Sequence, residues 1–65
     1  MRANLGTGTF EITAGALAAM RDWLSDLEWV DLTPEELQHV DRYRVVRAVD
    51  RHYSGGVRQF LAAIA

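Results

Sequence analysis

Apolar and polar residues alternate near the N-terminus. Within residues 7–13, Phe10 and Ile12 are separated by a polar residue and accompanied by β-branched threonines. Such alternation is typical of a short strand that buries one face. The two glycines that flank Thr7 can turn residues 2–5 back along this segment, so the pattern predicts a short N-terminal strand or hairpin. Two strands alone are marginal in water, so helices or another chain must cover them, and an exposed strand edge is a candidate dimer contact.

From residue 14 onward, the apolar positions recur every three or four residues, which is the spacing of one face of a helix. In the first such segment this face consists of Leu17, Met20, Leu24 and Leu27. The fold class predicted is mainly α, with the short strand or hairpin followed by a compact bundle of four short helices. We expect these helices at about residues 14–27, 34–40, 42–53 and 57–64.

Residues with known capping preferences mark where these helices begin and end. The clearest start is Thr33-Pro34-Glu35-Glu36. Here a threonine caps the helix, the proline occupies the first helical position where its missing N–H is harmless, and Glu36 closes a capping box. Thr13 and Asp41 are candidate N-caps of the helices that follow them. Ser54-Gly55-Gly56 ends the third helix, because a glycine just past a helix can adopt the left-handed conformation.

The break between the second and third helices follows from helical phase. At about 100° per residue, Leu37 and Val40 lie on one side of a helix, while the valines of the next segment lie roughly 160° away. One straight helix cannot bury both sets, so the chain must break near Asp41. A break at this position leaves almost no connection between the two helices.

The chain has 65 residues and no cysteine, so we expect one small domain, residues 1–65, without disulfides. A domain of this length buries only about 60% of the surface that its unfolded chain exposes, so its stability depends on good packing or on self-association as a homodimer. The first residues lack the apolar run of a signal peptide, and no segment approaches the roughly 20 apolar residues of a membrane span. We therefore expect a cytoplasmic protein.

All seven basic residues are arginine, and alanine, valine, leucine and glycine are abundant. This bias is typical of a GC-rich coding sequence, and it favours a high-GC bacterium, or a phage or mobile element of such a host. Residues 47–61, RAVDRHYSGGVRQFL, resemble short uncharacterised proteins of actinobacteria and their phages. The resemblance also extends to the order of strand, helix, acidic link and helix, and it implies no particular activity.

Charge is unevenly distributed along the chain. Residues 1–41 contain two arginines and eight acidic residues, a net charge of −6, whereas residues 42–65 contain five arginines and one aspartate, a net charge of +4. Arg44, Arg47 and Arg51 fall within about 60° of one another on the third predicted helix, opposite its valines. Because arginine binds carboxylates and phosphates through paired hydrogen bonds, these residues are a candidate binding surface. The alternatives are a solvated face, or neutralisation by the acidic first half of the chain.

The nucleic-acid alternative is a small DNA-binding regulator whose third helix enters the major groove. Two features argue against it. A helix-turn-helix usually has a turn of three or four residues, which the predicted break near Asp41 does not provide. The net charge of −2 is also not the basic balance expected of a domain that grips phosphates.

Candidate catalytic and metal-binding residues are few. The two histidines have acidic residues within reach: Glu35 and Glu36 for His39, Asp41 and Asp50 for His52. Their separation matches no ligand spacing for zinc, and a chain this short rarely builds both a core and a catalytic cleft. We therefore predict no enzyme activity, no cofactor and no metal site.

Trp23 and Trp29 bracket the end of the first predicted helix. Tryptophan is more often part of a core, but it is also enriched in interface hot spots, and Trp23 widens an apolar face that the leucines already provide. We predict a non-catalytic interaction module that binds another macromolecule, with a protein as the first candidate. Phages and mobile elements encode accessory proteins and inhibitors of this kind. The predicted partner-binding residues are Arg44, Arg47, Arg51, Trp23 and Trp29.

Overall fold

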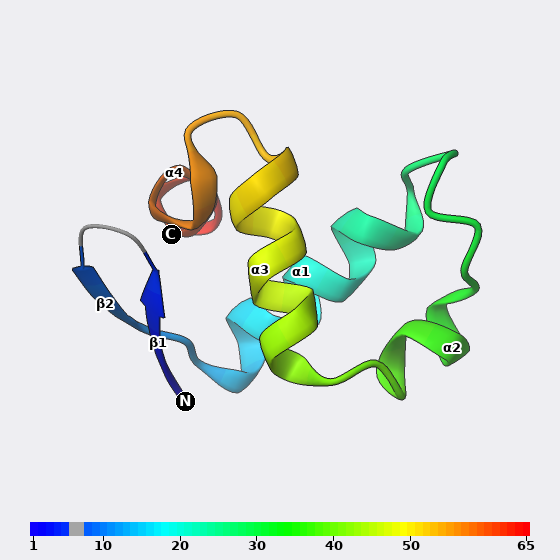
Figure 1. Ribbon diagram of the computed structural model, residues 1–65, viewed down its shortest axis with the longest axis horizontal. Coiled ribbons are helices and arrows are strands. Elements are labelled where there is room, and N and C mark those ends of the chain that lie inside the picture. Colours follow the sequence, from blue (N-terminus) through cyan, green and yellow to red (C-terminus); the bar gives the residue numbers. More distant parts are fainter. Residues whose placement is uncertain (6–7) are drawn as a thin grey trace.

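The computed structural model describes residues 1–5 and 8–65 (Figure 1). Two strands and four helices follow one another in these residues: β1 (Arg2–Leu5), β2 (Gly8–Glu11), α1 (Ala14–Ser25), α2 (Pro34–Gln38), α3 (Arg42–His52) and α4 (Gly56–Ile64). The predicted fold class, mainly α with an N-terminal hairpin and four short helices, is confirmed. The turn expected at Gly6 and the strand start expected at Thr7 lie outside the described residues.

The hairpin is antiparallel. Its Cα partners are Arg2 and Glu11, Ala3 and Phe10, Asn4 and Thr9, and Leu5 and Gly8. Just before β1, Met1 and Ile12 exchange both of their backbone hydrogen bonds, at 3.1 and 2.7 Å. Ala3 and Ile12 are buried, whereas Arg2, Asn4 and Glu11 are exposed, so one face of the hairpin covers the helices. Period-two alternation in the sequence therefore corresponds to a half-buried sheet.

Helix α3 lies in the middle of the molecule, between the hairpin and α2 (Figure 1). It packs against α1. The link from α2 reaches its N-terminal end, and α4 folds back on it after a tight turn. The buried apolar residues form one cluster drawn from the hairpin and all four helices: Ala3, Ile12, Ala16, Met20, Leu24, Leu37, Val45, Val46, Val49, Val57 and Phe60. The three valines of α3 therefore fix which of its sides faces solvent.

The predicted N-caps are confirmed. The hydroxyl of Thr13 accepts a hydrogen bond from the backbone N–H of Ala16 at 3.0 Å, and the carboxylate of Asp41 accepts one from Tyr43 at 3.0 Å. At α2 the capping box is complete, because Thr33 and Glu36 each accept from the other's backbone N–H. Each cap satisfies a backbone donor that has no partner inside the helix.

The predicted helix ends need correction. Helix α1 ends at Ser25, before the expected residue 27, because Asp26 and Leu27 donate to carbonyls three residues back, at 3.2 and 3.1 Å. Helix α2 ends at Gln38, before the expected residue 40, and its last turn tightens in the same way. Such bonds tighten the final turn of a helix. Helix α3 ends one residue early because Tyr53 is extended, and α4 begins one residue early at Gly56.

Arg21 helps to end α2. Its guanidinium donates hydrogen bonds to the carbonyls of Leu37 and Val40, the latter at 3.0 Å. These carbonyls belong to the end of α2 and the link that follows, where the helix no longer supplies a donor four residues on; the carbonyl of Leu37 also accepts from the backbone N–H of Val40 at 3.2 Å. Arg21 therefore joins α1 to the α2–α3 link, a role that its place off the apolar face of the first helix did not predict.

Candidate partner-binding site

The outer side of α3 carries three exposed arginines. Because Val45, Val46 and Val49 are buried, the positions opposite them must face solvent. Arg44, Arg47 and Arg51 occupy those positions and are all exposed. We call these three residues the arginine face.

None of these arginines is paired with a carboxylate in the part of the chain that the structure describes. The one ion pair within 4 Å there joins Arg2 and Glu11, at 3.3 Å on the exposed side of the hairpin. Asp50 is the only acidic residue after residue 41, and its carboxylate accepts from the backbone N–H of Val57 at 3.0 Å. It therefore caps the start of α4. Among the described residues, no ion pair joins the acidic residues 1–41 to the basic residues 42–65, as neutralisation between the two halves of the chain would require.

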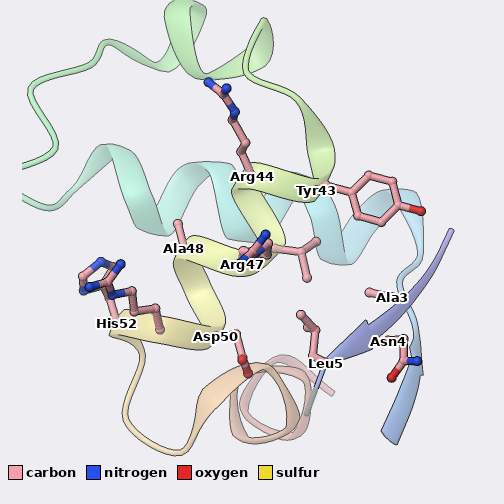
Figure 2. A pocket seen from close by; sticks show the side chains of 11 residues that line it. Ala3, Asn4, Leu5, Tyr43, Arg44, Arg47, Ala48, Asp50 and His52 are labelled. Atoms are coloured by element: carbon pink, nitrogen blue, oxygen red, sulfur yellow. The ribbon is translucent and has the colours of Figure 1, made fainter.

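An open groove of about 800 Å³ lies on one side of the arginine face, between β1 and α3 (Figure 2). In this view the ring of Tyr43 points toward β1, Arg44 extends away from it, and Arg47 lies on the next turn of α3. Asp50 and His52 mark the far end of the same wall. The wall formed by α3 is therefore largely cationic, while the opposite wall is a strand.

A smaller apolar pocket of about 280 Å³ lies on the other side of the arginine face. It is lined by residues of α1, of the link before α2, of α2, of the α2–α3 connection and of α3: Leu24, Trp29, Val30, Leu32, Leu37, Val40 and Val45. Arg44, Ala48 and His52 line both hollows. The arginine face is thus a cationic ridge between a polar groove and an apolar pocket, an arrangement that requires the tertiary fold and was not predicted from the sequence.

The two tryptophans lie in different surroundings. Trp29 is 60% exposed at the rim of the apolar pocket, and its ring centroid lies 4.5 Å from that of His52. Trp23 is half-buried and packs edge-on against Tyr53 and Phe60, at centroid distances of 5.2 and 6.1 Å. It holds α1 against the residue that follows α3 and against α4. Trp29 therefore lies beside the arginine face, whereas Trp23 contributes to the interior.

The histidines do not form the acid pairs considered from the sequence. His52 lies against Trp29, and among the described residues no ion pair within 4 Å joins His39 or His52 to a carboxylate. In residues 1–5 and 8–65, no group of three or more histidine, cysteine, aspartate or glutamate residues is placed to hold a metal ion. The same residues contain no helix that is both long and apolar enough to cross a membrane.

The connection between α2 and α3 is longer than predicted. Because α2 ends at Gln38, three residues, His39, Val40 and Asp41, join it to α3. This length is that of a helix-turn-helix, so the objection based on the turn no longer applies. However, Glu35 and Glu36 are exposed in the first turn of α2, the helix that would cross the DNA backbone. Their charge opposes contact with phosphates.

No protein-family model, no curated protein and no solved structure matches the chain. The purpose of the arginine face is therefore inferred from its own chemistry.

Proposed function

We propose that this protein is a non-catalytic module that binds another protein, and that the arginine face receives an acidic surface of that partner. The observation that carries the proposal is the position of Arg44, Arg47 and Arg51. They are exposed and unpaired among the described residues, all three line the groove, and Arg44 also lines an apolar pocket with Trp29 at its rim. The cationic ridge supplies charge and the pocket supplies an apolar anchor point.

The two kinds of contact have different roles in such an interface. An arginine gains most from a carboxylate that it grips through two parallel hydrogen bonds, and this geometry selects for acidic side chains. Buried aromatic and arginine side chains dominate the binding energy of most interfaces. Trp29 and Arg44, which share the apolar pocket, are therefore the residues whose loss should weaken binding most. We place the protein in the cytoplasm, as an accessory protein or inhibitor of a phage or mobile element.

The experiment that tests the proposal is a selection from a displayed random-peptide library with the purified protein as bait. We expect the selected peptides to contain several acidic residues and at least one large apolar residue. The same peptides should fail to bind a variant in which Arg44, Arg47 and Arg51 are replaced by glutamine, while circular dichroism shows unchanged helix content. Peptides without acidic enrichment, or peptides that bind the variant equally well, would refute the proposal.

The second candidate function is DNA binding through α3, and the three-residue connection between α2 and α3 is the observation that favours it. Salt distinguishes the two functions. Both functions use arginine and weaken as salt rises, but counterion release from DNA makes the loss steep, whereas the apolar pocket retains part of the contact with a protein partner. Sedimentation of the protein with a labelled generic DNA duplex, at low and at physiological salt, measures this dependence. Comigration at low salt that is lost at physiological salt, without selected peptides, favours the DNA function.

A further inference from the structure

We propose that the groove between β1 and α3 binds an extended acidic segment of the partner, which adds as a strand to the free edge of β1. This inference rests on the proposed function and specifies the conformation of the ligand. Strand addition supplies affinity through backbone hydrogen bonds and specificity through alternate side chains. The groove offers both elements, a strand edge on one wall and arginines on the other.

Within residues 1–5 and 8–65, the backbone groups on the outer edge of β1 have no hydrogen-bond partner. In an antiparallel pair, residues that exchange hydrogen bonds alternate with residues that do not. Met1 and Ile12 exchange both bonds, and the register places Ala3 opposite Phe10 in the next pair of this kind. The N–H and C=O groups of Arg2 and Asn4 are therefore directed away from β2. They are available to a third strand.

This edge borders the groove. Ala3, Asn4 and Leu5 all line it, and none of residues 9–11 of β2 does. Since successive side chains of a strand point to opposite faces, a hollow that touches three consecutive residues runs along the edge of the strand. Figure 1 also shows β1 on the side of the hairpin next to α3, with β2 beyond it. Because β1 also packs directly against α3, a segment in the groove would lie over the line where the two elements meet, beside the edge of β1 and the arginine face.

The charge of the groove selects an acidic segment. Arg44, Arg47 and Arg51 contribute three cationic groups to its wall, and its only acidic residue, Asp50, is already hydrogen-bonded to the start of α4. Tyr43, 54% exposed and pointing toward β1, offers an aromatic surface at one end. Because β1 has four residues, the paired part of the ligand would be about four residues long, or about 13 Å.

A second copy of this chain is a poorer occupant. A symmetric pairing of two β1 edges would bring the two arginine faces toward each other across the interface, since each lines the groove beside its own β1. Like charges placed together across an interface oppose association. Charge complementarity therefore favours an acidic partner segment over a homodimer at this edge.

The test uses a short acetylated and amidated peptide of alternating glutamate and valine, with its affinity measured by calorimetry. Two variants of the protein form a matched pair. Asn4→Pro removes an outward N–H from the edge of β1, and Thr9→Pro removes the equivalent outward N–H from the edge of β2, because Asn4 and Thr9 are opposite each other. We expect Asn4→Pro to weaken binding at least about tenfold and Thr9→Pro less than about threefold.

A second measurement uses the unmodified protein, so that the result does not depend on how a proline variant folds. Two further peptides carry N-methyl groups either on the valine amides or on the glutamate amides. Only alternate amides of an added strand face its neighbour, so only one of these two peptides should lose affinity. The amides of Arg2 and Asn4 should also exchange more slowly when the unmethylated peptide is bound, and those of Thr9 and Glu11 should not.

Equal weakening by the two proline variants, or equal binding of the two methylated peptides, would overturn strand addition. The proposed function survives a failure of strand addition if the peptide still loses affinity for the variant in which the arginine face is replaced by glutamine. Binding to the arginine face does not require an extended ligand. Self-association that Asn4→Pro abolishes would instead assign the edge to a second copy and overturn the inference.

Discussion

Arg21 and Arg47 carry the same guanidinium group in opposite surroundings. Arg21 is half-buried and donates to the carbonyls of Leu37 and Val40, whereas Arg47 is exposed and has no carboxylate within 4 Å among the described residues. Helical phase places both residues off the apolar stripe of their helices, so the sequence does not separate their roles. The difference depends on where α2 ends relative to α1, which is a tertiary property.

Replacing Arg21 with methionine should therefore destabilise the protein. Methionine keeps much of the apolar stem but cannot donate, so the two carbonyls lose a charged partner, and the free energy of unfolding should fall by about 2 kcal/mol. Arg58→Met is the control, because Arg58 is exposed, and its effect should stay within about 0.5 kcal/mol. Urea denaturation measures both. Equal effects of the two substitutions would show that the Arg21 contacts do not stabilise the fold.

At the scale of the elements, the sequence predicted the number, order and type of helices because capping residues and apolar spacing act locally. Thr13, Thr33 and Asp41 are confirmed as caps. The C-terminal ends were less well predicted, since tightened final turns and the Arg21 contact depend on neighbouring elements. The start of α4 likewise depends on Asp50, which caps it from seven residues away.

The turn before α4 should be intolerant of a side chain at Gly56. Its φ of +74° is strained for other residues, and an added Cβ would lie 2.7 Å from Oδ1 of Asp50, the cap of α4. Gly56→Ala should lower the free energy of unfolding by at least about 1 kcal/mol. Gly15→Ala in α1 is the matched control, because the nearest atom to its Cβ is 4.0 Å away, and it should stabilise by at most about 1 kcal/mol. Thermal denaturation measures the stability of both variants. An unchanged stability of Gly56→Ala would show that the turn tolerates a side chain at this position.

The capping box of α2 should contribute to the pH dependence of stability. Hydrogen bonds from the backbone and side chain of Thr33 lower the pKa of Glu36 below its ordinary value of 4.5. Because the pKa is lower in the folded state, this contribution is fully present above 4.5 and is lost as the pH falls through the folded-state pKa. Glu36→Gln keeps an acceptor but does not titrate. The stability of this variant should therefore fall less than that of the unmodified protein as the pH decreases below 4.5.

Glu35→Gln is the control for this prediction, because it removes the same formal charge from the first turn of α2 without altering the capping box. Denaturation curves recorded across the acidic range should show a flatter pH dependence for Glu36→Gln than for Glu35→Gln. Parallel curves for the two variants would mean that the carboxyl of Glu36 does not contribute to the pH dependence of stability.

At the scale of the whole molecule, the sequence predicted the arginine face but not what borders it. The face follows from helical phase within α3, whereas the groove requires β1 and the apolar pocket requires the link before α2. Trp23 and Trp29 show the same limit. Their spacing in the chain suggested one aromatic surface, but the fold places Trp23 against Tyr53 and Phe60 and leaves Trp29 exposed.

The proposed binding site depends on the position of the arginines and not on the overall charge of the protein. The most direct test measures the affinity of a selected acidic peptide for two variants with equal formal charge. One replaces Arg44 and Arg47 with glutamine, and the other replaces Arg42 and Arg58, two exposed arginines outside this face, with glutamine.

We expect the first variant to lose at least about tenfold in affinity and the second less than about threefold, because carboxylates must reach arginines placed beside the groove and the pocket. Equal losses in the two variants would show that only net charge matters, and unchanged affinity in the first would remove the arginine face from the binding site.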